Sequence, residues 1–114
     1  MNDVARMFAR TRRAAALLVA VAAAGCALRP LPPVDADVRT AARAVALPVE
    51  QVARGRALLV GACAACHAPI HPLDLELADW DDALPRMLRK ADLGADAGAA
   101  VRAYVQVVHL APVR

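Results

Sequence analysis

The sequence of 114 residues is short enough for a single domain. Its net charge of +3 comes from 14 Lys and Arg against 11 Asp and Glu, and the first 25 residues, with four Arg and one Asp, supply all of that excess. Residues 26–114 therefore carry no net charge, so nucleic-acid binding loses its main support, because it normally requires a basic patch on the folded domain.

The composition also limits the core that the chain can build. Hydrophobic residues make up 60% of the sequence, but there is one Trp, one Tyr and one Phe, and Phe8 lies in the N-terminal segment. Small domains with so few large side chains often need a metal or a cross-link to stay folded. We therefore expect a bound group to contribute part of the core.

Residues 1–25 have the pattern of a secretory signal peptide. Several arginines precede an unbroken apolar run from Ala14 to Ala24, which is short for a membrane-spanning helix of about 20 residues. The next residues, Ala23-Ala24-Gly25-Cys26, resemble the lipobox of bacterial lipoproteins. The resemblance implies cleavage before Cys26, a lipid on its thiol, and a periplasmic protein anchored to a membrane. An ordinary cleaved signal with a free Cys26, or an uncleaved anchor, stays open.

Residues 26–48 are interpreted as a Pro-rich tether between the lipid and the domain, with a short helix over Thr40 to Leu47. From Val49 to about Ala65 the apolar spacing predicts a helix. A loop follows over 68–78. Asp79 is expected to cap a helix that contains Pro85 and ends near residue 91. Asp96 is expected to cap a last helix that reaches His109. No segment alternates like a strand, so residues 49–114 are predicted to form an all-α domain.

The helix predicted from Val49 leads into the segment Cys63-Ala64-Ala65-Cys66-His67. Two thiols at this spacing can add to the two vinyl groups of one haem, and the following His then ligates the iron, so the motif indicates c-type haem attachment. Three cysteines is an odd number, and assigning Cys26 to a lipid leaves this pair. A zinc site that adds His71 has suitable ligand types. A thioredoxin-like redox pair would need a βαβ setting, which the sequence does not show.

Residues around the motif resemble class I c-type cytochromes. Gly55 lies eight residues before Cys63 and Leu59 four before it, as in the N-terminal helix of that family, and Tyr104 matches the aromatic residue that packs across the Gly. The resemblance covers roughly residues 52–108. It implies three to four helices around one covalent haem c with its iron, and it implies that His67 ligates the iron while its other ring nitrogen donates to a carbonyl at Pro69 or Pro72.

The segment from Trp80 to Met87 looks like a subgroup of small single-haem cytochromes, in which a Trp precedes a Met by seven residues. Because Trp80, Leu84, Met87 and Ala91 share one helical face, Met87 is the preferred sixth ligand. His71, His109 or an open site stay as alternatives. Trp80 is expected either to donate its indole N–H to a haem propionate or to be a core residue.

We therefore expect an electron carrier and not an enzyme, with a dehydrogenase or an oxidase as its redox partner. His/Met ligation saturates the iron and raises its reduction potential. The alternative is a haem-based ligand sensor or small haem peroxidase, which needs an open or labile sixth site. A structural lipoprotein with an incidental haem is a third hypothesis.

Overall fold

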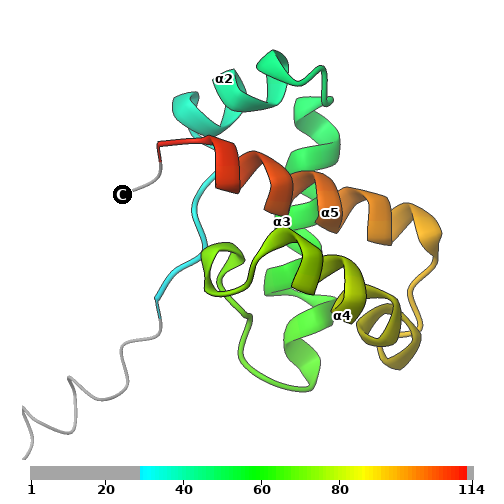
Figure 1. Ribbon diagram of the computed structural model, residues 1–114. Helices are drawn as coiled ribbons and strands as arrows, with labels where there is room; N and C mark the ends of the chain where they lie inside the picture. Colours follow the sequence, from blue (N-terminus) through cyan, green and yellow to red (C-terminus); the bar gives the residue numbers. More distant parts are fainter. Residues whose placement is uncertain (1–28, 113–114) are drawn as a thin grey trace, which may run out of the picture.

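The computed structural model describes residues 29–112, so the expected signal peptide and Cys26 lie outside the described residues. This part contains helices and no strand (Figure 1). The elements are α2 (Ala36–Ala44), α3 (Val49–Val60), the 3₁₀ turns η1 (Ala62–Ala65) and η2 (Pro72–Asp74), α4 (Leu77–Lys90) and α5 (Ala95–Leu110). The prediction of an all-α domain is confirmed for these residues.

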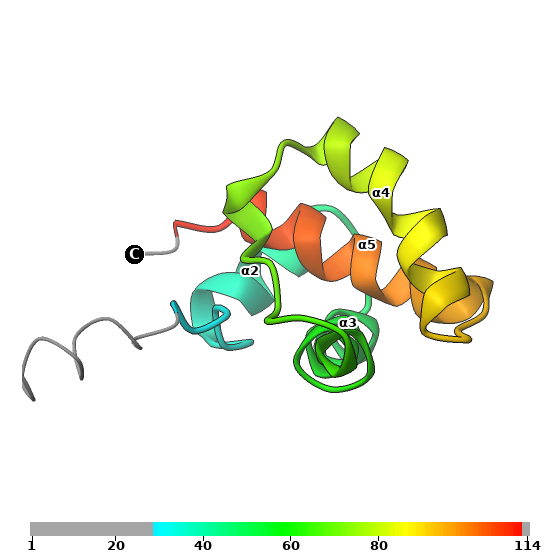
Figure 2. The ribbon, with the colours of Figure 1, turned by 90° about the horizontal axis from the view of Figure 1, so that it is seen from below.

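The C-terminal helix α5 is the centre of the fold. It lies between α3 and α4, and both of them pack on it (Figure 2). Six of its side chains have no exposed surface: Ala100, Val101, Tyr104, Val105, Val107 and Val108. Because most of these are valines, the core is made of small side chains in close contact, with Trp80 and Tyr104 as its largest members.

Helices α3 and α5 cross at Gly55. A Cβ atom at Gly55 would lie 2.0 Å from the backbone oxygen of Ala100 and 2.9 Å from the Cβ of Tyr104. Backbone atoms cannot approach a side chain that closely, so the crossing requires glycine. The contact between Gly55 and the aromatic residue of the last helix is the one that the sequence predicted.

The segment predicted as an extended tether is folded from residue 31 onward. Leu31, Val38 and Ala42 are buried, and α2 packs against α5 and α3. The helix starts earlier than Thr40 because the carboxylate of Asp35 accepts from the backbone N–H groups of Asp37 and Val38, both at 3.1 Å. The folded domain therefore begins about 18 residues before the predicted boundary at residue 49.

Hydrogen bonds hold the start of this segment on the core. The Tyr104 hydroxyl donates to the Pro32 carbonyl at 2.7 Å, and the Arg56 guanidinium donates to the carbonyls of Pro32 and Leu31 at 2.9 and 3.2 Å. Burial raises the pKa of Tyr104 to about 12, although Arg56 opposes this, so the hydroxyl stays a donor at physiological pH.

The predicted helix boundaries are wrong at three points. The helix predicted over 49–65 ends at Val60, because the chain turns at Gly61 into η1. Helix α4 begins at Leu77, so Asp79 lies in its first turn and is not its cap. Helix α5 likewise begins at Ala95 after Gly94, which leaves Asp96 in the first turn. Both aspartates still lie at the positive end of a helix dipole, which is a favourable position for them.

Pro85 lies inside α4, where one backbone hydrogen bond is lost. Within residues 29–112, none of the helices has the length and hydropathy needed to cross a membrane.

Candidate haem site

A cavity of about 300 Å³ lies between two segments. The first is η1 together with the residues that follow it, and the second is the later part of α4. One side is formed by Ala62, Cys63, Cys66 and His67, and the other by Ala83, Arg86, Met87, Lys90 and Ala91. Helices α3 and α4 both pack on α5, which keeps them apart and leaves this space (Figure 2). The fold thus brings the Cys-x-x-Cys-His motif and Met87 to the same cavity.

The turn after α3 presents the two cysteines. Gly61 ends the helix, and the backbone N–H of Ala64 donates to its carbonyl at 3.0 Å, which tightens the chain into η1. Cys63 is half-buried and Cys66 is exposed, and both carry free thiols. Burial raises the pKa of the Cys63 thiol, so this sulfur stays protonated at neutral pH.

The ring of His67 is oriented by its own loop. Its Nδ1 lies 2.8 Å from the Ala68 carbonyl oxygen, and because a carbonyl can only accept, Nδ1 carries the proton. The lone pair is then on Nε2, which is the tautomer that a metal ligand needs. The acceptor differs from the expected carbonyl at Pro69 or Pro72, because the adjacent Ala68 carbonyl is already within reach.

Met87 contributes a half-buried side chain to the α4 side of the cavity. Ala83 and Ala91 are four residues before and after it, so they lie on the same helical face and leave room beside the thioether. Ala83 was not predicted to belong to the site, and its spacing from Met87 is its one sequence signal. Trp80 and Leu84, predicted on this face, are buried in the core and do not line the cavity.

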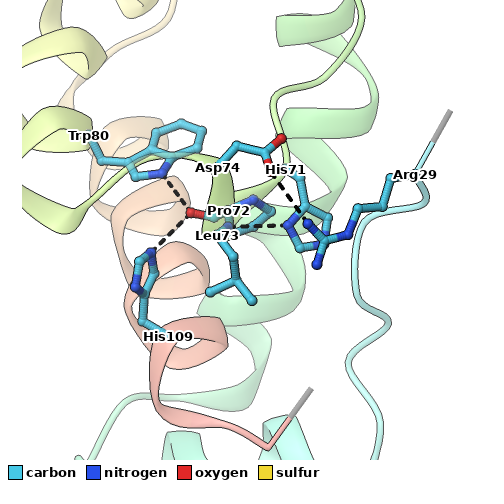
Figure 3. A network of polar contacts seen from close by, with 7 residues as sticks. All are labelled: Arg29, His71, Pro72, Leu73, Asp74, Trp80 and His109. Atoms are coloured by element: carbon cyan, nitrogen blue, oxygen red, sulfur yellow. Dashed lines mark hydrogen bonds and ion pairs between the residues drawn. The ribbon is translucent and has the colours of Figure 1, made fainter. Parts of the chain in front are cut away.

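The indole of Trp80 has a different partner from the propionate that was considered. Its Nε1–H donates to the Pro72 carbonyl at 3.0 Å, and 1% of the residue is exposed. The same carbonyl accepts from Nε2 of His109 at 3.0 Å (Figure 3). Trp80 is therefore a core residue that fixes η2 against α4 and α5 in this structure.

The two other histidines lie away from the cavity. His71, an alternative sixth ligand, is 5% exposed, and its Nδ1 accepts from the Leu73 N–H at 3.2 Å (Figure 3). Burial, together with the positive charge of Arg29, lowers the pKa of His71, although Asp74 opposes this shift. His109 is bound to Pro72 as described. Neither histidine lines the cavity.

Two basic side chains complete the lining. Arg86 and Lys90 reach the cavity from α4, whereas Arg89 on the same helix does not. Two thiols, an imidazole with a free Nε2, a thioether and two cations form a donor set that fits a haem, which has two vinyl groups, an iron and anionic propionates. Cys63, Cys66, His67 and Met87 would hold the group, and Arg86 and Lys90 carry the charge that its propionates need.

The described residues contain no cluster of three or more His, Cys, Asp or Glu side chains arranged to hold a metal ion. A haem iron held by one His and one Met would not need such a cluster, because only the His is among these residue types. Comparison with known proteins found no match to a family model, to a curated protein or to a solved structure.

Proposed function

We propose that this chain is a small membrane-tethered electron carrier with one haem attached through Cys63 and Cys66. The observation that supports the proposal best is the cavity that Met87 shares with Cys63, Cys66 and His67. The motif fixes chemistry on one side of a haem, and of the side chains considered for the sixth position, Met87 is the one that lines this cavity.

Each residue then has a defined task. The thiols of Cys63 and Cys66 would hold the haem, each S–H adding across one vinyl group to form a thioether bond. His67 would ligate the iron through Nε2 while the Ala68 carbonyl holds its Nδ1–H, and Met87 would ligate from α4. The haem would supply one-electron transfer, and a thioether ligand would favour its reduced form.

The proposed location is the bacterial periplasm, with a lipid at Cys26. The partners are redox proteins, namely a dehydrogenase or an oxidase, which exchange electrons at the haem edge. Residues 26–114 carry no net charge, so long-range electrostatic attraction contributes little to partner choice.

The visible spectrum of the purified protein tests this proposal. We expect a low-spin ferric spectrum with the weak long-wavelength band of a methionine sulfur ligand, and a ferrous form that binds carbon monoxide slowly or not at all. A high-spin spectrum with rapid carbon monoxide binding would contradict electron carriage. It would favour the ligand sensor or the small peroxidase, since both need an accessible sixth position.

A further inference from the structure

The start of the folded segment lies very close to the residue expected to carry the lipid. Leu31 is 6% exposed, and its carbonyl and that of Pro32 are held by Arg56 and Tyr104. Five residue steps separate Cys26 from Leu31. At about 3.6 Å per step, a group on Cys26 lies within roughly 18 Å of Leu31.

That reach is shorter than the domain is wide. A compact domain of the 84 residues described has a radius of gyration of about 12 Å, and hence a diameter of roughly 30 Å. A lipid at Cys26 therefore cannot place the far side of the domain against the bilayer. The side from which the N-terminal segment leaves the fold has to face the lipid.

Most of the exposed large apolar side chains lie next to segments of that side. The described residues contain four exposed large apolar side chains, namely Val45, Val60, Leu73 and Leu110, with 37%, 44%, 38% and 54% of their surface exposed. Val60 lines a hollow of about 400 Å³ with Arg29 and Pro30. Leu73 adjoins Asp74, whose carboxylate lies 3.4 Å from the Arg29 guanidinium.

Leu110 is the last residue of α5, and the end of α5 lies on the same side. Its neighbour His109 is bound to the Pro72 carbonyl, and Pro112 lines a second hollow with Arg29. The N-terminal segment, η2 and the end of α5 all lie at the left of Figure 1. The loop between α2 and α3, which contains Val45, lies at the top of Figure 1.

We propose that the face formed by Arg29, Val60, Leu73 and Leu110, here called the exit face, rests on the lipid surface of the membrane. This inference depends on the lipid anchor that forms part of the proposed function. The short chain between Cys26 and Leu31 selects the face, and its apolar side chains enter the interface of the bilayer. Arg29 is paired with Asp74, so attraction to anionic lipid contributes little and the contact persists at raised salt.

This orientation leaves the haem cavity exposed to water. Helix α4, which supplies four of the cavity residues, extends away from the exit face (Figure 1). None of the residues that line the cavity belongs to the exit face. The redox partner then reaches the cavity through its water-exposed part and not within the bilayer.

Neutron reflectometry of the lipidated holoprotein on a supported bilayer of phosphatidylcholine and phosphatidylglycerol tests the orientation. We expect a protein layer one domain thick, directly against the headgroups, at low and at raised salt. A layer separated from the headgroups by water would overturn the proposal. A layer two domains thick would do the same, because the exit face would then be covered by a second copy of this chain.

A longer tether isolates the contribution of the exit face. Inserting a flexible linker of about 20 residues between Ala27 and Leu28, with a reach of roughly 25 Å, removes the constraint of the short chain. In this background the combined variant Val60→Glu, Leu73→Glu and Leu110→Glu should move the layer away from the bilayer. Val45→Glu, the matched control, should leave it in place. Equal behaviour of the two variants would overturn the proposal.

The outcome for the exit face is separable from the outcome for the haem. A protein that washes off the bilayer contradicts the lipid anchor and this inference with it. A protein that lies flat on the bilayer, but whose absorption spectrum shows no low-spin haem, contradicts electron carriage and supports the exit face.

Discussion

At the scale of single residues, the cavity divides its chemistry between two segments. The motif supplies two thiols and an imidazole whose Nδ1–H is held by Ala68, and α4 supplies a thioether and two cations. The assignment of Cys63, Cys66 and His67 followed from spacing alone, because haem attachment needs those atoms at those positions. Met87 was chosen from periodicity, and the fold adds that it lines the cavity, whereas Trp80 and Leu84, predicted on the same face, are core residues.

Replacing Met87 by alanine tests the sixth ligand. Met87→Ala should abolish the methionine band in the ferric spectrum and allow the ferrous form to bind carbon monoxide rapidly, because the iron loses one ligand. Leu88→Ala is the matched control, since Leu88 is the next residue on α4 and packs against the core. Its spectrum should match the wild type. An unchanged spectrum in Met87→Ala would show that another residue ligates the iron.

The cations at the cavity should raise the reduction potential. The ferric form carries one more positive charge than the ferrous form, so a nearby cation disfavours it. Arg86→Gln combined with Lys90→Gln should lower the potential by tens of millivolts, of the order expected from Coulomb's law at partly exposed distances. Potentiometric titration measures the shift. Arg89→Gln, which removes a cation outside the cavity, should change the potential much less, and equal shifts would contradict the placement.

His71 should make the protein less stable in mild acid. Its pKa is lowered in the folded state, so the unfolded chain binds the proton more tightly, and stability is lost as the pH falls below about 6.5. Protonation also removes the Nδ1 acceptor of the Leu73 N–H, a hydrogen bond of about 0.5–1.5 kcal/mol.

His71→Asn keeps an acceptor at this position and does not titrate. Urea unfolding at pH 7 and pH 5 should therefore show a larger loss of unfolding free energy in the wild type than in His71→Asn. Equal losses would contradict this role.

At the scale of the elements, the sequence predicted that the helices exist and that α3 begins at Val49, but not where α2, α4 and α5 begin. The all-α pattern followed from periodicity, whereas the crossing at Gly55 was implied by the resemblance to class I c-type cytochromes. The cap positions did not follow from either, because Asp79 and Asp96 are as favourable in a first turn as at a cap. Helix α2 was missed in part because its Pro-rich surroundings are typical of a tether, while its burial depends on Val38 and Ala42 meeting α5.

The crossing of α3 and α5 predicts a severe effect of a single methyl group. Gly55→Ala places a Cβ against the backbone of Ala100, so the helices have to move apart, and such overpacking costs about 1–3 kcal/mol or more. Urea unfolding measures the loss. Gly94→Ser is the control, because no atom lies within 4 Å of a Cβ there and serine is a favourable cap. Wild-type stability in Gly55→Ala would contradict the close crossing.

At the scale of the whole molecule, the core and the cavity depend on each other. The core is built mainly from valine and alanine, with two large aromatic residues. Helix α4 packs on α5, and another face of α4 lines the cavity. A haem in the cavity would fill the space between α4 and the motif and add the apolar mass that the composition lacks. The sequence alone indicated this need and the helix face that carries Met87, but not that Trp80 and Leu84 of that face belong to the core.

The central claim is a covalent haem on Cys63 and Cys66, and intact-mass spectrometry of the denatured protein tests it most directly. In a host that attaches haem to exported proteins, we expect the mass of the processed chain plus one haem, and a haem-bearing proteolytic peptide that contains Cys63-Ala64-Ala65-Cys66-His67. Cys63→Ser combined with Cys66→Ser should give the same chain without that increment. A wild-type mass without haem would contradict the account.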